Sequence, residues 1–178
     1  MAGTWQIRPE RPEDADAVAA LDNDGFGPGR YAKSAYRLRE GVAPVASLGF
    51  VAVDNSAPMG SVRFWPIKIG SDDALLLGPL AVRSGERGRG IGVALMRHGI
   101  DEARATDFAA IVLVGDEPYY SRAGFTRIAQ GRVRFPGPVN TARILGLALK
   151  DGALEKLSGD IARAHIDRPV CADGARLG

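Results

Sequence analysis

The chain has 178 residues, of which 46% are apolar and 25% charged, so its composition is that of an ordinary globular domain with one core. These values exclude intrinsic disorder, and no apolar run approaches the ~18 residues that a bilayer crossing needs, so we expect no membrane partner. The net charge of +2 is too small to indicate binding to nucleic acid.

The scarcity of cysteine and histidine removes several kinds of chemistry. Cys171 is the only cysteine, which excludes an internal disulfide and a cysteine-cluster zinc site. Two histidines, His98 and His165, leave little for metal ligation or for a Ser-His-Asp triad, so we expect no metal. The amino-terminal residues lack the charged-then-apolar layout of a signal peptide, and we expect a cytoplasmic location.

The first part of the chain predicts a strand and two helices. Residues 4–8 alternate as a short strand, and residues 12–14 open a helix, since proline suits the first turn and acids favour its positive end. The glycine-rich stretch 22–29 predicts a loop that ends this helix. A second short helix is predicted by apolar residues at helical spacing, namely Tyr31, Ala35 and Leu38.

Three strands are predicted next. Residues 48–54 and 59–69 are β-rich runs separated by a hairpin signal at 55–58. Residues 74–82 are nearly all apolar, as expected for a strand covered on both faces. Within this strand Pro79 cannot donate to a ladder, and together with Gly78 it predicts a β-bulge.

A helix is predicted from about 91 to 106, after a loop at 83–90. Gly92 and Gly99 lie on its apolar side and should let it pack closely on the sheet. Its buried stripe consists of Val93, Met96, Ile100 and Ala103.

The rest of the chain predicts a buried strand at 109–114, a turn or short helix through Ala123, and strands at 125–128 and 143–149. The order of elements indicates an α/β fold with a mixed sheet. We interpret residues 1–149 as one domain. Residues 150–178 form a tail that packs on the same domain and contains a helix near Leu154–His165.

The segment from Ser84 to Gly92 joins a buried strand to the start of a helix. The first turn of a helix has unpaired N–H groups and partial positive charge, so it attracts phosphate. Glycines let the backbone come close to the anion, and arginines add charge. The segment therefore predicts a pyrophosphate cradle.

Two familiar phosphate motifs do not fit this cradle. Gly85 and Gly90 have the spacing of a Walker loop, but Ile91 and Gly92 follow instead of lysine and a hydroxyl residue. A dinucleotide fingerprint needs glycine or alanine where Val93 stands, and it needs its glycines directly after the strand. A third pattern, Arg/Gln-x-x-Gly-x-Gly/Ala, is matched in full by residues 87–92.

This hexapeptide resembles the loop that holds the pyrophosphate of acyl-CoA in the GNAT family, the GCN5-related N-acetyltransferases. A second segment, residues 119–125, resembles the Tyr-x-x-x-Gly-Phe element that ends the CoA site in that family. The order of elements over residues 4–149 also matches, and the Gly-Asp-x-x-Tyr-Tyr form is similar to a largely uncharacterised bacterial branch. The resemblance implies a mixed, mostly antiparallel sheet flanked by helices on both faces.

The resemblance also implies an activity, in which acetyl-CoA serves as co-substrate and a primary amine of a small molecule or peptide attacks the thioester directly. Tyr120, four residues before Gly124, matches the usual general acid and would donate to the departing thiolate. Tyr119 is interpreted as a packed aromatic. The positions matching the cofactor site are Leu80, Ala81, Val82, Arg87, Gly88, Arg89, Gly90, Ile91 and Gly92.

The sequence departs from the family pattern in two places. Gly115 and Asp116 stand where many members have an asparagine, and residues 75–82 lack the carboxylate that often acts as base. A CoA-binding sensor without turnover, or an enzyme that uses a longer acyl-CoA or an acyl carrier protein, therefore stays open. Trp65 and Pro66 either line an acceptor pocket or pack in the core. The sequence does not identify the acceptor or the general base, and it leaves a homodimer open.

Overall fold

The computed structural model of the chain describes residues 4–27, 34–55 and 57–165. Its strands are β1 (Gln6–Pro9), β2 (Gly49–Asp54), β3 (Ala57–Ile69), β4 (Asp72–Val82), β5 (Ala110–Val114), β6 (Thr126–Arg127), β7 (Val133–Arg134), β8 (Ile144–Ala148) and β9 (Gly159–Arg163). Its helices are α1 (Ala15–Phe26), α2 (Ser34–Arg37), α3 (Ile91–Ala103), α4 (Glu117–Tyr120) and α5 (Ala153–Lys156). Tyr31 and Cys171, which entered the sequence predictions, lie outside the described residues.

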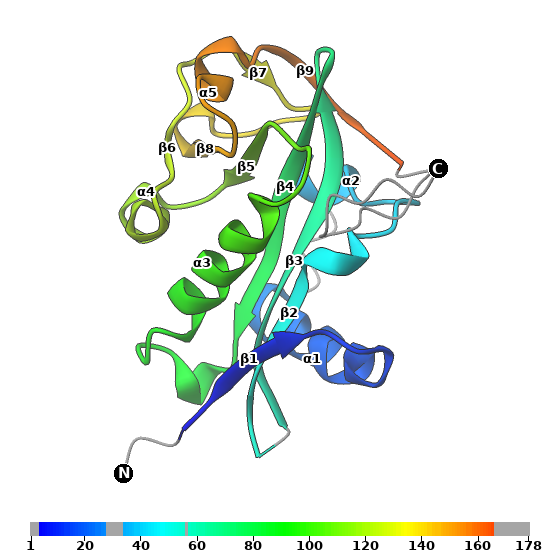
Figure 1. Ribbon diagram of the computed structural model, residues 1–178, viewed down its shortest axis with the longest axis vertical. Helices are drawn as coiled ribbons and strands as arrows, with labels where there is room; N and C mark the ends of the chain where they lie inside the picture. Colours follow the sequence, from blue (N-terminus) through cyan, green and yellow to red (C-terminus); the bar gives the residue numbers. More distant parts are fainter. Residues whose placement is uncertain (1–3, 28–33, 56, 166–178) are drawn as a thin grey trace.

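Within the described residues, nine strands form one sheet in the order β1-β2-β3-β4-β5-β8-β6, and β9 pairs with both β3 and β7 (Figure 1). Neighbouring strands are antiparallel, except that β4 runs parallel to β5 and β7 runs parallel to β9. The predicted α/β fold, with a mostly antiparallel mixed sheet, is confirmed.

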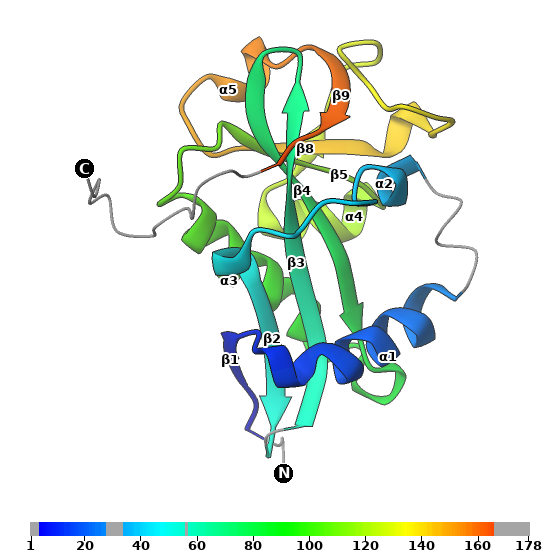
Figure 2. The ribbon, with the colours of Figure 1, turned by 90° about the vertical axis from the view of Figure 1, so that its right-hand side faces the viewer.

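Helices cover both faces of this sheet, with α3 on one face and α1 and α2 on the other (Figure 1, Figure 2). The predicted apolar stripe of α3 is buried in the core. Gly99 makes the contact with the sheet close, since a Cβ there would lie 2.4 Å from the ring of Phe64 in β3. Among the helices that the structure describes, none combines the length and the apolar character that a bilayer crossing needs.

The predicted bulge interrupts the pairing of β4 with β3. Val62 pairs with Leu80, whereas Phe64 pairs with Leu77, so Gly78 and Pro79 together oppose a single residue of β3. The peptide bond between Gly78 and Pro79 is cis. A bulge bends its strand, and here it lies just before the residues predicted to contact the cofactor.

The predicted loop at 22–29 is wrong in its first half, because α1 continues to Phe26. Asp22 is buried, and Gly25 lies against β4, where a Cβ would be 3.8 Å from that of Ala81. The helix ends at Gly27, whose φ of 61° lets its N–H donate to the carbonyl of Asn23 at 3.0 Å. Packing against the sheet therefore outweighs the loop-forming composition of this segment.

The predicted helix near Leu154–His165 is also wrong. Only α5 is helical there, and β9 follows it and pairs with β3 from Ile67 to Ile69. Gly159 is the first residue of β9 and has a φ of 123°, which no helix allows. Its N–H donates to the carbonyl of Arg132 at 2.8 Å, just before β7, a strand that the sequence did not predict.

Candidate active site

The turn between β4 and α3 is open. Gly88 and Gly90 have φ angles of 84° and 79°, which favour glycine because a side chain would be strained there. A Cβ built on either residue would meet no atom of the described chain within 4 Å. Gly90 is the N-cap of α3 and gives it no side-chain hydrogen bond, so within the described part of the chain no side chain is seen to cap the first amides of the helix. The backbone here has the geometry of an anion site.

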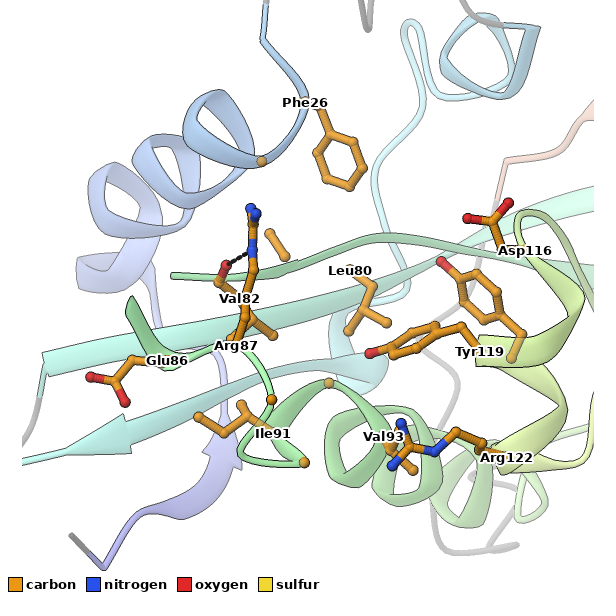
Figure 3. Close-up of a pocket in the computed structure, with 16 residues that line it drawn as sticks. Phe26, Leu80, Val82, Glu86, Arg87, Ile91, Val93, Asp116, Tyr119 and Arg122 are labelled. Atoms are coloured by element: carbon orange, nitrogen blue, oxygen red, sulfur yellow. Dashed lines mark hydrogen bonds between the residues drawn. The ribbon is translucent and has the colours of Figure 1, made fainter. Parts of the chain in front are cut away.

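The turn opens into a cleft of about 510 Å³ (Figure 3). Four segments line it: the end of α1, the end of β4, the turn with the first residues of α3, and α4 with its neighbours. The lining residues are Gly25, Phe26, Leu80, Ala81, Val82, Glu86, Arg87, Gly88, Gly90, Ile91, Gly92, Val93, Asp116, Tyr119, Tyr120 and Arg122.

One wall of the cleft is formed by the end of β4. This strand pairs with β5 only at Leu75 and Leu76, and beyond the bulge the two strands are no longer hydrogen-bonded to each other. The edge of residues 80–82 that faces away from β3 therefore has N–H and C=O groups outside the ladder. Such groups need partners, and a ligand in the cleft can supply them.

The two arginines of the turn point to different partners. Arg87 lines the cleft, and its Nε donates a long hydrogen bond of 3.4 Å to the carbonyl of Val82. Arg89 forms an ion pair with Glu86 and is not among the residues that line the cleft. Of these two cations, Arg87 is the one placed to contact an anion in the cleft.

Tyr120 lies at the far end of the cleft from the turn, where α4 follows β5. Its ring fills the space above Gly115, whose Cβ would lie 2.2 Å from a ring carbon, and it meets Phe125 edge-on at a centroid distance of 6.1 Å. Burial, together with the neighbouring Tyr119 and Asp116, raises the pKa of the Tyr120 phenol to about 12. Tyr120 is therefore a hydrogen-bond donor at neutral pH.

Tyr119 points along the cleft toward α3 (Figure 3). Its hydroxyl lies only 2.1 Å from the position that a Cβ on Gly92 would take. This contact therefore requires glycine at the first turn of the helix. Burial raises the pKa of Tyr119 as well. Tyr119 therefore connects α4 to the start of α3.

Comparison with known proteins identifies the family. Residues 15–125 match the model of the acetyltransferase (GNAT) family. The chain belongs to this family. YhbS of Escherichia coli K12, described as an uncharacterised N-acetyltransferase, is 35% identical to this GNAT chain over 158 residues, which cover 86% of the chain and 92% of YhbS.

Solved GNAT structures share the fold. The crystal structure of E. coli YhbS in complex with CoA superposes with a TM-score of 0.78 at 31% identity and covers 92% of each chain. A GNAT acetyltransferase from Brucella melitensis in complex with acetyl-CoA gives a TM-score of 0.68 at 27% identity, over 91% of this chain and 97% of that one. The family resemblance inferred from residues 87–92 and 119–125 is confirmed.

The structure of this GNAT chain brings most of the predicted site residues to one cleft. All of the positions predicted to bind the cofactor line it except Arg89, and Tyr120 lines its other end. Of the two residues proposed for the acceptor side, Pro66 is buried, and Trp65 is half-buried with its indole N–H bonded to Gly78.

Sequence reasoning missed the wall that α1 contributes. Phe26 is a large apolar residue that is 39% exposed, and it hangs from the end of α1 over β4 (Figure 3). Ser84 Oγ donates to Asp24 Oδ2 at 2.6 Å and ties this end of α1 to the turn. The helical spacing of Val18, Leu21 and Gly25 was the available signal.

Proposed function

We propose that this GNAT protein transfers the acetyl group of acetyl-CoA to a primary amine of a small molecule or peptide. One observation supports the proposal most directly: a single cleft combines an uncapped helix start, an unpaired strand edge and a tyrosine. CoA and acetyl-CoA in the YhbS and Brucella structures support the same ligand class for this chain.

In this proposal the amides of residues 88–92 and the guanidinium of Arg87 bind the diphosphate, and the main chain of residues 80–82 pairs with the pantetheine amides. A cleft of about 510 Å³ is within the range of cofactor sites. A main-chain N–H near the bulge would face the thioester oxygen and stabilise the oxyanion.

The reaction joins the amine nitrogen to the thioester carbonyl carbon and breaks the C–S bond. The nitrogen loses a proton, the CoA thiolate gains one, and the products are an amide and free CoA. We assign Tyr120 a hydrogen bond to the leaving sulfur. A thiol has a pKa of about 8.5, well below the value of about 12 for Tyr120, so hydrogen bonding is favoured over full transfer of the phenolic proton.

The first test is the charge reversal Arg87→Glu, measured by calorimetry with acetyl-CoA. Replacing a cation by an anion beside the diphosphate should weaken binding by roughly 100-fold or more. Arg104→Glu makes the same charge change on an exposed residue at the opposite end of α3 and should leave the affinity unchanged. An unchanged affinity in Arg87→Glu would contradict the proposed site.

The second test is release of free CoA thiol in the presence of a broad panel of amines. Release with at least one amine supports acetyl transfer. Tight acetyl-CoA binding without release for any amine would indicate a CoA-binding module without turnover. Longer acyl-CoA donors measured alongside test the chain length, and failure of free CoA to compete with the donor would indicate an acyl carrier protein instead.

A further inference from the structure

Next to the cleft, on the face of the sheet covered by α1 and α2, lies a cation with no part in the proposed cofactor site. Arg39 follows α2, and its guanidinium carbon lies 5.9 Å from the ring centroid of Trp65 in β3. Its Nη2 is 2.8 Å from the position that a Cβ on Gly78 would occupy. Arg39 therefore reaches the β4 bulge, just before Leu80, which lines the cleft.

The bulge is fixed in place under this guanidinium. Trp65 Nε1 donates a hydrogen bond of 2.6 Å to the carbonyl of Gly78, so the same indole holds the bulge and lies against Arg39. Gly78 has a φ of 126° and no side chain, which leaves room for the arginine. The three residues form one arrangement beside Leu80, which lines the cleft.

Arg39 forms no ion pair with the described residues, although the buried carboxylate of Asp22 acts on it electrostatically from beyond ion-pair distance. Its Nε is buried and has no hydrogen-bond acceptor within the part of the chain that the structure describes. By contrast, Arg63 on the same face of β3 is paired with Glu10 through Nε at 2.9 Å. Arg39 is partly exposed, and burying its Nε without an acceptor is unfavourable, so a ligand that reaches this guanidinium would supply the missing contact.

The groups that face Arg39 electrostatically are Asp22, Tyr36, Tyr120 and Arg63. Burial has a larger effect on the pKa of Arg39 than these groups have, and it lowers that pKa to about 10. The guanidinium therefore still carries its charge at neutral pH. Of these groups Tyr120 lines the cleft, and Arg39 itself reaches the bulge just before Leu80, another lining residue. An acceptor that reaches Tyr120 would therefore pass close to Arg39.

We propose that Arg39 binds an anionic group of the acceptor, a carboxylate or a phosphate, located a few bonds from the reacting amine. The proposal rests on the proposed acetyl transfer. CoA enters from the α3 side, so the acceptor approaches the thioester from the other end, where the bulge and Arg39 lie. The planar fork of a guanidinium matches carboxylate and phosphate oxygens in pairs, and here its Nε has no other acceptor.

The experiment compares acceptors that differ only in the anion. β-Alanine is paired with β-alaninamide to test a carboxylate, and O-phosphoethanolamine is paired with ethanolamine to test a phosphate. Binding is measured by saturation-transfer NMR on the full chain, free and saturated with CoA, and thiol release from acetyl-CoA is measured in parallel. At least one anionic member should bind and react about tenfold better than its neutral partner.

The variants locate this preference. Arg39→Gln should reduce the ratio between the two members of the preferred pair to about one, and Arg39→Lys should keep part of it because the charge remains. Arg37→Gln removes an exposed arginine of α2 two positions away and should leave the ratio unchanged. Acetyl-CoA affinity serves as the fold check for every variant. If Arg39→Gln does not fold, the test is the selectivity ratio of Arg39→Lys compared with that of the natural chain.

Three outcomes would overturn this role for Arg39: equal binding of both members in both pairs, a ratio that survives Arg39→Gln, or an equal loss with anionic and neutral amines. The last would mean that Arg39 acts on the reaction or the fold. Failure of the natural chain to bind acetyl-CoA would instead contradict the proposed function, so the two failures are distinguishable.

Discussion

The two ends of the cleft are built in different ways. At the α3 end, the site is formed mainly by backbone groups. Gly88 and Gly90 shape a turn with open space around it, and within the described residues no side chain is seen to cap the first amides of the helix. At the opposite end, side chains from separate elements meet: Leu80 of β4 and Tyr120 of α4 line the cleft, and Arg39 reaches the bulge just before Leu80. A backbone site depends little on which side chains surround it, whereas a side-chain site can change with the acceptor.

This contrast has consequences for mutation. At the backbone end, the identity of an exposed side chain matters less than the conformation that its residue allows. At the side-chain end, removing one functional group should change turnover or selectivity and leave the cofactor affinity unchanged. Three substitutions test this division, in order of expected effect.

The largest effect is expected for Tyr120→Phe. It removes the donor proposed for the leaving sulfur and keeps the packed ring, so kcat should fall by about 100-fold while calorimetry gives an unchanged acetyl-CoA affinity. Tyr119→Phe is the matched control and should keep kcat within a few-fold. Loss of acetyl-CoA binding in Tyr120→Phe would show that this tyrosine belongs to the cofactor end instead.

The pH profile sharpens this prediction. Burial raises the pKa of Tyr120 to about 12, so the phenol keeps its proton as the pH rises through the ordinary tyrosine range near 10. Loss of its proton should therefore lower kcat only above about pH 11. If kcat falls near pH 10 and Tyr120→Phe removes that fall, the phenol is less buried than the structure shows.

A smaller effect is expected for Gly90→Ala, compared with Gly85→Ala. Both positions have open space for a Cβ, but only Gly90 of the two has a positive φ, at 79°. A side chain there costs about 1–2 kcal/mol in the left-handed region, so the turn should relax away from its binding conformation and acetyl-CoA affinity should fall about tenfold. Equal affinities by calorimetry would mean that the turn conformation does not control binding.

The same division explains what the sequence could predict. The cradle is contiguous from Arg87 to Gly92, and the bulge has its own signal in Gly78-Pro79, so both are visible in a short stretch of sequence. The extension of α1 is not, because Asp22 and Gly25 have the composition of a loop and become helical through burial against β4. Tertiary contacts therefore determine the helical conformation at the end of α1.

Non-local pairing accounts for the other differences. β9 forms because residues 159–163 meet β3, and its short sequence, which begins with a glycine, has little strand signal of its own. Arg39 contacts Trp65 and Gly78, which lie on two different strands, and no spacing in the sequence connects the three. Signals carried by one backbone segment can be predicted, whereas side-chain constellations assembled by topology need the structure.

The smallest effect is expected where the two ends meet, at Gly92. In Gly92→Ala the new methyl group would lie 2.1 Å from the Tyr119 hydroxyl, so the ring must move, and acetyl-CoA affinity should fall a few-fold. Tyr119→Phe removes that oxygen and leaves a ring carbon at 3.4 Å, a tolerable contact, so the double variant should recover the affinity of Tyr119→Phe alone. Calorimetry on the four proteins gives the coupling. Additive losses would mean that the methyl group obstructs the anion at the helix start directly, and Tyr119 would then not be the link between α4 and α3.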